Sequence, residues 1–383
     1  MNVFMKIVAA IDSFKGSMTS VQAGKAAAKG IHKVDPEAEV RVRPLADGGE
    51  GTVEALVSGM NGIIRKVKVT GPLGKPVICE YGVIEGEEEK TAVIEIAGAA
   101  GLTLLLPEER NPLYTTTYGV GETIKDAVVN GCRRFIIGIG GSATNDGGAG
   151  MLQALGFGLL KENGEQIPTG ALGLEELAEI TDDHVIPGLA ECRFKIACDV
   201  TNVLCGETGA SAVYGPQKGA DKEMTERLDR LLFSYASLVK KKVPKADPMY
   251  PGTGAAGGLG FAFLAFMEAQ LESGIQIVIK ETGLEKEIAK ADLVITGEGR
   301  MDGQTAMGKA PIGIAKLAKK YGKPVIAFTG TAAPDAGACN EQGIDAFFPI
   351  LREAVTLEEA MKPENAKANM EAAAEQAYRL WRL

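Results

Sequence analysis

The sequence predicts an α/β protein with two domains: a discontinuous Rossmann- or flavodoxin-like domain with a parallel sheet, and a second, mixed α/β domain inserted into it. At both ends of the chain, short β-branched runs alternate with helical patterns, which is typical of βαβ units and a parallel sheet. The middle of the chain has hairpin signals and loop-rich stretches instead. The length of 383 residues allows two or three domains of roughly 150 residues each.

The N-terminal part predicts three strands and two helices. The apolar run at 6–11 is expected to be a strand buried on both faces. A helix follows at 19–30, with Ser17 or Thr19 as its N-cap. The other elements of this part are strands at 39–43 and 62–69 and a helix at 50–58.

From residue 70 the pattern becomes that of an antiparallel hairpin, with strands at 77–84 and 91–96 around an acidic turn. A loop-rich region at 156–193 interrupts the α/β pattern that follows. The elements around it are helices at 121–129, 148–155, 224–240 and 255–271, and strands at 134–139 and 194–199.

The C-terminal part is regular again, and its last helix begins at Thr356 or Pro363. Strands are expected at 276–279, 292–296, 324–329 and 346–348, with helices at 284–290 and 311–321. We therefore assign residues 1–70 and 275–383 to the Rossmann-like domain and residues 71–274 to the inserted one. Two consecutive domains, joined by the turn-rich stretch 242–252, are the alternative.

Composition excludes several classes of protein. The net charge of −9 and the dispersed Lys and Arg residues argue against a nucleic-acid partner. Six cysteines without a C-x-x-C pair, together with two histidines, argue against a zinc site. The longest strongly apolar stretch, 259–267, is far below the ~18 residues of a membrane span. We expect a soluble, cytoplasmic protein without a membrane partner.

Glycine is unusually frequent: 49 of the 383 residues are glycine, or about 13%, against about 7% in typical proteins. Five glycine-rich or acidic loops stand out, and most of these loops lie at strand–helix junctions, where open α/β sheets bind ligands. The first loop, 12–17, presents Asp12, Ser13 and Lys15 before a helix N-terminus, which suits an anionic ligand. A capped helix with a solvated lysine is the alternative.

The second loop, 46–52, has Asp47 and Glu50 among three glycines. These residues offer little surface for packing, which favours a functional role over a structural one. A bare turn with Asp47 or Thr52 as helix cap is the alternative. The third loop, 138–150, contains G-x-G-x-x-A after a strand and so resembles a dinucleotide fingerprint. The helix begins too late for that motif, so we favour phosphate binding by backbone amides and polar side chains. The candidates are Gly140, Gly141, Ser142, Thr144 and Asn145.

The fourth loop, 252–260, matches G-x-G-x-x-G without a preceding strand, so either close helix packing or a ligand explains it. The fifth, 296–310, fits G-x-x-x-x-G-K, but Ala310 stands where a P-loop has its Mg²⁺-binding hydroxyl. We keep Lys309 as a phosphate ligand and Glu298 and Asp302 as Mg²⁺ ligands; a solvated charged loop is the alternative.

Asp199 ends the predicted strand at 194–199, which is a common place for a catalytic base or a metal ligand, although it could simply cap a turn. No G-x-S-x-G elbow is present, so hydrolytic triad chemistry lacks its parts. Anion-binding loops, separate lysines and loop-tip carboxylates are what phosphoryl transfer requires. A two-domain architecture that closes around an active-site cleft would suit this reaction.

Several of these loops resemble those of the glycerate kinase type-1 family, in the family's order from about residue 6 to about residue 349. The strings are IDSFKGSMTS, PLADGGEGT, GIGGSATNDGGAGMLQALG, ACDVTNVLCGETGA, YGPQKGA, GTGAAGGLG and DLVITGEGRMDGQTAMGKAP. One departure is Val203, where the family pattern leads us to expect proline. The resemblance implies a two-domain α/β enzyme that uses ATP and Mg²⁺ to phosphorylate D-glycerate, usually to 2-phosphoglycerate rather than 3-phosphoglycerate.

The resemblance does not assign roles, so the following are hypotheses. Glycerate's carboxylate is held by Asp12, Ser13 and Lys15 of the first loop and by Arg300. The ATP phosphates lie against Gly140–Asn145 and Lys309. The general base is Asp199 or Asp47. Mg²⁺ is bound either by the other of these two aspartates or by Glu298 with Asp302. We expect a monomer or homodimer. A nicotinamide-dependent oxidoreductase and a non-catalytic nucleotide-binding regulator are the rival functions.

Overall fold

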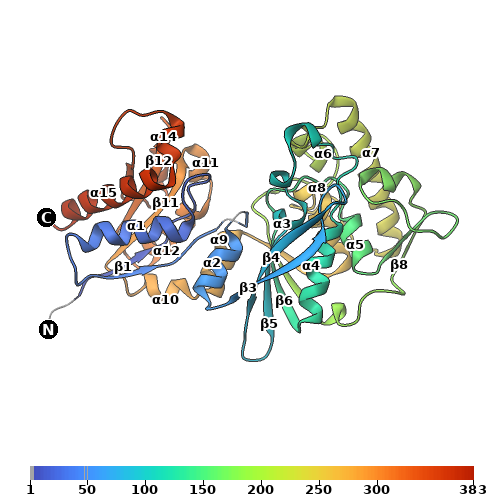
Figure 1. The fold of residues 1–383 in the computed structure, drawn as a ribbon, viewed down its shortest axis with the longest axis horizontal. Helices are drawn as coiled ribbons and strands as arrows, with labels where there is room; N and C mark the ends of the chain where they lie inside the picture. The colour runs from blue at the N-terminus through green and yellow to red at the C-terminus, as the bar shows by residue number, and fades with distance from the viewer. Residues whose placement is uncertain (1–3, 47, 50) are drawn as a thin grey trace. The chain divides into compact units, whose positions relative to one another are not determined.

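The computed structural model describes residues 4–46, 48–49 and 51–383. By their contacts, the residues divide into two compact units (Figure 1). Unit 1 comprises Met1–Asp47, Glu54–Met60 and Ile275–Leu383, and unit 2 comprises Gly48–Val53 and Asn61–Gly274. Both units are α/β, which confirms the predicted fold class.

Unit 1 is built on a five-stranded sheet in which every neighbouring pair of strands is parallel. Its spatial order is β13-β12-β11-β1-β2. Numbered within the unit, this is the 2-1-3-4-5 order of flavodoxin-like folds. The strands are β1 (Lys6–Ala9), β2 (Glu39–Val42), β11 (Leu293–Met301), β12 (Val325–Ala332) and β13 (Ala346–Pro349).

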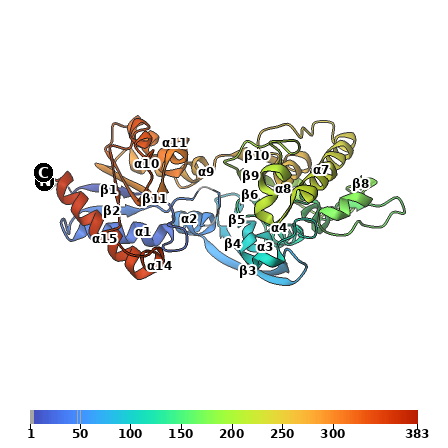
Figure 2. The same cartoon turned by 90° about the horizontal axis from the view of Figure 1, so that it is seen from above.

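Helices cover both faces of this sheet, with α1 and α15 on one face and α10 on the other (Figure 2). The helices here are α1 (Ser20–His32), α2 (Thr52–Gly59), α9 (Gly274–Glu281), α10 (Leu284–Ile288), α11 (Gly303–Ala306), α12 (Ala310–Lys320), α13 (Ala338–Glu341), α14 (Leu357–Met361) and α15 (Pro363–Trp381). Thr19 is the N-cap of α1, because its hydroxyl and the Gln22 side chain form a capping box.

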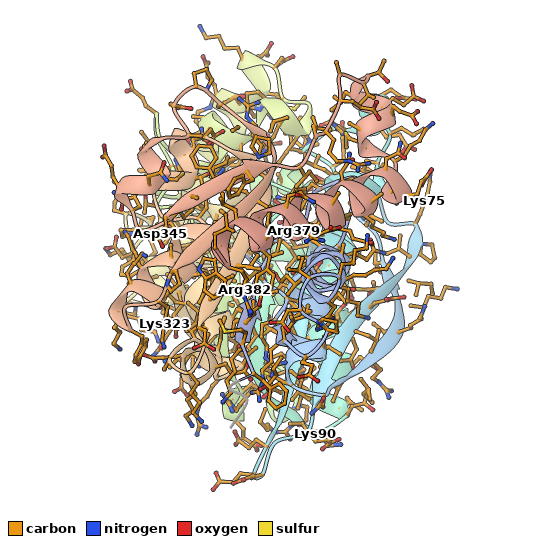
Figure 3. The ribbon with its side chains drawn as sticks, turned by 90° about the vertical axis from the view of Figure 1, so that its left-hand side faces the viewer. Lys75, Lys90, Lys323, Asp345, Arg379 and Arg382 are labelled. Atoms are coloured by element: carbon orange, nitrogen blue, oxygen red, sulfur yellow. The ribbon has the colours of Figure 1, made fainter. Side chains whose placement is uncertain are left out.

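The first and last long helices pack side by side, so the two ends of the chain share one core. Ile31 of α1 and Met370 of α15 lie in the same buried cluster as Ile7 of β1. In addition to this helix contact, Tyr378 and Arg382 of α15 donate hydrogen bonds to Asp35 Oδ2 at 3.1 and 2.9 Å. Figure 3 labels Arg382 near the end of α15. The C-terminal helix is therefore needed to cover the sheet that the N-terminal strand begins.

Unit 2 has a mixed six-stranded sheet in the order β10-β9-β6-β5-β4-β3. Its first three strands along the chain pair antiparallel and the others parallel, as the hairpin signals indicated. The strands are β3 (Ile63–Thr70), β4 (Pro76–Ile84), β5 (Lys90–Glu95), β6 (Cys132–Gly138), β9 (Arg193–Ala197) and β10 (Glu268–Glu272), beside a two-stranded ribbon of β7 (Gly158–Leu160) and β8 (Glu179–Thr181).

The α-helices of this region are α3 (Ala97–Ala100), α4 (Tyr118–Val129), α5 (Ala149–Ala154), α6 (Ala210–Tyr214), α7 (Lys222–Lys242) and α8 (Ala255–Phe266). Five 3₁₀ helices are η1 (Leu102–Leu104), η2 (Pro107–Glu109), η3 (Ala171–Glu176), η4 (Leu189–Glu191) and η5 (Pro216–Lys218). No helix in the described part of the chain has the length and apolar character to cross a membrane.

Several elements differ from the prediction. The β-branched run at 276–279 is part of helix α9, whose Ile275 packs against Gly313 of α12, so tertiary packing overrides strand propensity. The helix predicted at 255–271 ends at Phe266, and strand β10 follows, parallel to β9. The strand predicted at 62–69, assigned to the first domain by a boundary at 70, belongs to the second sheet because β3 pairs with β4.

Gly30 makes the α1–α15 contact testable. A Cβ at this position would lie 2.1 Å from the carbonyl oxygen of Glu371 and 2.9 Å from the backbone nitrogen of Glu375. Alanine in place of a helical glycine ordinarily stabilises a protein by about 1 kcal/mol. Here we expect Gly30→Ala to lower the free energy of unfolding by about 1–3 kcal/mol, since overpacking forces the helices apart.

Urea denaturation of Gly30→Ala beside Gly337→Ala measures this effect. A Cβ at Gly337 would meet nothing within 4 Å, so this control should stay within about 0.5 kcal/mol of the wild type. A stabilised Gly30→Ala would show that the two helices do not pack backbone to backbone there.

Candidate active site

A cavity of about 390 Å³ opens in unit 1. Its walls come from the segments that follow β1 and β13, from the ends of β11 and β12, from Asp302 and Lys309 after β11, and from α14 and α15. Strands β1 and β11 are the neighbours at which the strand order reverses, which is where doubly wound sheets bind their ligands. The cavity brings together the candidate residues of the first and fifth loops: Asp12, Ser13, Lys15, Glu298, Arg300, Asp302 and Lys309.

The first loop is a tight turn held by its own backbone. Phe14 and Met18 exchange N–H···O hydrogen bonds of 2.9 and 3.0 Å, which leaves Lys15 exposed at the tip of the turn. Asp12 is largely buried, and its Oδ1 accepts the Ser13 amide at 2.7 Å. The turn therefore presents a largely buried carboxylate and an exposed ammonium to the same cavity.

The fifth loop is not a loop at its start, because β11 continues through Glu298 and Arg300 to Met301. Arg300 lies opposite Thr331 of β12 in the parallel register. The strands can run on because glycines face each other: a Cβ at Gly330 would lie 2.5 Å from the carbonyl oxygen of Gly299. The extended strand gives Glu298 and Arg300 a rigid support that the sequence pattern did not indicate.

Two carboxylates hold the turn after this strand. Glu298, buried at 8% exposure, accepts the Thr305 hydroxyl at 2.6 Å. Asp302 caps α11, since its Oδ1 accepts the amides of Gln304 and Thr305 at 3.0 and 3.2 Å. Its Oδ2 lies 3.4 Å from Arg300 Nε. Asp302 thus orders the turn and also faces a cation at the cavity.

These carboxylates fit Mg²⁺, which is usually bound by one or two carboxylates together with water and substrate phosphates. In the described ranges, no three His, Cys, Asp or Glu side chains gather where they could hold a metal by themselves. Asp47, the other predicted ligand and candidate base, lies outside the described residues, as does Glu50. Lys309, the residue before α12, lines the same cavity and adds a positive charge.

The second, third and fourth loops meet in unit 2. A Cβ at Gly138 would lie 2.4 Å from the carbonyl oxygen of Gly48, and one at Gly257 would lie 2.1 Å from that of Thr144. The Gly147 amide donates to Gly257 O at 2.9 Å. Gly257 and Gly258 of the fourth loop therefore serve close packing against the third loop, one of the two explanations that the sequence left open.

The predicted phosphate-binding residues of the third loop differ in access. Gly140 and Gly141 are exposed, whereas Ser142, Thr144 and Asn145 are buried at 5% exposure or less. The side-chain Nδ2 of Asn145 donates a hydrogen bond to Ser211 Oγ at 2.9 Å. The buried side chains therefore shape the loop, and the two glycines carry its accessible backbone.

Lys218 is a residue that sequence reasoning missed. Although only 2% exposed, it donates from Nζ to Ser142 Oγ at 2.8 Å and to the carbonyl oxygen of Thr144 at 2.6 Å. Burial lowers the pKa of this ammonium to about 7, against the opposing effect of the Asp146 charge. The one signal for it was its place in YGPQKGA, a string shared with the family that the sequence resembles.

Asp146 is the fully buried acid beside this lysine. It accepts the amide and hydroxyl of Thr117 at 2.8 and 2.9 Å, and the amides of Gly148 and Gly150 at 3.1 and 3.3 Å. Burial raises the pKa of Asp146, while these hydrogen bonds act in the opposite direction. The hydrogen bonds of Lys218 and Asp146 therefore help to fix the shape of the third loop.

Asp199, the other candidate base, is exposed after β9 in unit 2, and its Oδ1 accepts the Gly274 amide at 3.2 Å. It is not among the residues that line the cavity of unit 1. The structure thus joins Lys15, Arg300, Glu298, Asp302 and Lys309 in one cavity, and leaves Asp199 and Gly140–Asn145 outside it.

Comparison with known proteins shows the family of this chain. The profile of the glycerate kinase family matches residues 7–382. The chain belongs to the glycerate kinase family. A glycerate kinase of Halalkalibacterium halodurans is 49% identical over 93% of both chains. A glycerate 2-kinase of Escherichia coli K12 is 48% identical over 94% of this chain and 93% of its own.

A solved structure from Salmonella typhimurium LT2, provisionally named glycerate kinase 2, has the same fold. It superposes with a TM-score of 0.88 at 47% identity and covers 99% of this chain and 98% of its own. The resemblance found in the loop sequences is thereby confirmed, and the chain is an enzyme of the glycerate kinase class.

The buried Lys218 makes the stability of the protein depend on pH in a predictable direction. In the folded state the pKa of Lys218 is about 7 instead of 10.5. At pH values between 7 and 10.5, Lys218 is protonated in the unfolded chain but largely unprotonated in the folded one. The contribution of Lys218 to the free energy of unfolding therefore rises with pH. We expect the unfolding free energy of the wild type minus that of Lys218→Met to increase between pH 7 and pH 9 by up to ~1.4 kcal/mol per pH unit.

Denaturant titrations at several pH values measure this difference, with Lys222→Met, an exposed lysine of α7, as the control. The difference should be flat below pH 7, where Lys218 is protonated in both states. A difference that falls as the pH rises would mean that the folded state favours the ammonium.

Proposed function

We propose that this chain transfers the γ-phosphoryl group of ATP to D-glycerate with Mg²⁺, and that the cavity of unit 1 holds the acid, the metal and the transferred group. The observation that carries the proposal is the joint lining of one cavity by two loop-borne lysines, a strand-borne arginine and three carboxylates. Phosphoryl transfer depends on positioning and on charge stabilisation by such groups. The name of the Escherichia coli relative, glycerate 2-kinase, supports 2-phosphoglycerate as the product.

In this proposal Lys15 and Arg300 bind the carboxylate of glycerate, with Asp12 and Ser13 orienting its hydroxyl groups. Lys309 neutralises the donor phosphates. Glu298 and Asp302 would hold Mg²⁺, which, when bound, balances negative charge on the phosphate oxygens. Arginine suits this position because its planar guanidinium binds carboxylates in a bidentate manner.

The remaining roles are assigned on chemical grounds. The amides of Gly140 and Gly141 are proposed to bind ATP phosphate, and Ser142, Thr144 and Asn145 to hold their loop in the shape that exposes those amides. Asp199 or Asp47 is proposed as the general base that accepts the proton of the attacking hydroxyl.

A coupled ADP-release assay with D-glycerate, glycolate, tartronate and lactate tests the proposal. We expect ADP formation with D-glycerate, its loss in EDTA, and its recovery with added Mg²⁺. Phosphorus NMR of the product then identifies the phosphorylated position. Absence of ADP formation would favour a nucleotide-binding regulator, and NADH binding with a fluorescence change would favour an oxidoreductase.

Replacing Lys15 by alanine should raise KM for D-glycerate about 10- to 100-fold, because a hydrogen bond to a charged group contributes roughly 1.5–3 kcal/mol. Steady-state kinetics with glycerate varied at saturating ATP measure the effect. Lys25→Ala, at an exposed position of α1, is the matched control. An unchanged KM would remove Lys15 from the substrate site.

Replacing Asp199 by asparagine should lower kcat by about 10²- to 10⁴-fold if this residue is the base, with little effect on KM. Asp183→Asn, at an exposed position of the same unit, controls for the loss of a surface charge. Retention of more than about a tenth of wild-type kcat contradicts the assignment, and Asp47→Asn in the same series then tests the alternative base.

A further inference from the structure

One wall of the unit 1 cavity is not explained by glycerate. The side chains of Leu351, after β13, and of Leu357 and Met361 on α14 line the cavity together with Ile350 and Ala360. Leu351 and Leu357 are 39% and 72% exposed. A three-carbon hydroxy acid has almost no apolar surface to bury against such a wall. The cavity therefore has room and surface for a second, partly apolar group.

The place of this wall narrows the choice of ligand. The same cavity carries Lys15, Arg300 and Lys309, so a ligand that fills both parts has an anionic end and an apolar end. Its volume of about 390 Å³ lies within the ~300–1,000 Å³ of typical small-molecule sites. It also lies at the point of strand-order reversal of a 2-1-3-4-5 sheet, where related folds bind nucleotides.

A hydrogen-bonding group borders the apolar wall. Asn369 of α15 lines the cavity, and its Oδ1 accepts Arg352 Nε at 3.0 Å, which orients the amide. The opposite side of that amide has two N–H donors. A purine ring combines flat apolar faces with ring nitrogens that accept such donors.

We infer that this apolar wall is the nucleobase subsite of the phosphoryl donor: the purine packs against Leu351, Leu357 and Met361, and the phosphates extend toward Lys309. The inference rests on the proposed function and adds to it the part of the donor that unit 1 binds. Burial of the exposed leucine surface by the ring removes apolar area from water, which favours binding.

The test is the replacement Leu357→Asp, which places a carboxylate against the purine at a position exposed enough to leave folding unaffected. Binding of a fluorescent ADP analogue should weaken at least 10-fold, and KM for ATP should rise by a similar factor. KM for D-glycerate should change less than 2-fold. Binding of inorganic tripolyphosphate, which has no base, should be unchanged.

Val355→Asp is the matched control, since Val355 lies in the same segment, is 42% exposed and does not line the cavity. Unchanged ADP-analogue binding in Leu357→Asp overturns the inference, as does an equal loss of tripolyphosphate binding or a rise in KM for glycerate alone. Failure of the proposed function gives a different result. In that case the wild type binds the ADP analogue and Leu357→Asp binds it more weakly, but the wild type releases no ADP with D-glycerate.

Discussion

Close contact between backbone segments at glycine is the constraint on which both functional regions depend. In unit 1, Gly299 and Gly330 let β11 and β12 run side by side past the end of the predicted strand. In unit 2, Gly138 lies against Gly48, and Gly257 against Thr144. A Cβ at Gly330, Gly138 or Gly257 would lie 2.5, 2.4 or 2.1 Å from a carbonyl oxygen, so these segments could not approach each other with a side chain there.

In unit 1 the consequence is a rigid site. Because β11 remains in the sheet as far as Met301, Glu298 and Arg300 project from a hydrogen-bonded strand instead of a mobile loop. Asp302 follows the last residue of this strand and is the N-cap of α11. Charges that must stabilise a transferring phosphoryl group act best when they are already fixed in place, so this support is favourable for the proposed chemistry.

In unit 2 the corresponding support comes from buried charge. Lys218 and Asp146 lie almost entirely out of water, which costs free energy for each ion unless hydrogen bonds compensate. Asp146 receives four hydrogen bonds from backbone and hydroxyl donors, and Lys218 donates to the third loop itself. This arrangement keeps the loop in one conformation and leaves only the backbone of Gly140 and Gly141 accessible.

The sequence by itself determined the α/β class, the antiparallel hairpin of β4 and β5, the Thr19 cap as one of two candidates, and the family. These properties depend on local periodicity, capping chemistry and loop strings, all of which are visible in the chain. Only the tertiary structure decided that 276–279 is helical, that Arg300 lies on a strand, that Asn145 is buried and that Lys218 supports the third loop. Each of these depends on which distant segment packs against the residue, for instance α12 against α9 or η5 against the loop after β6, and no local pattern encodes that choice.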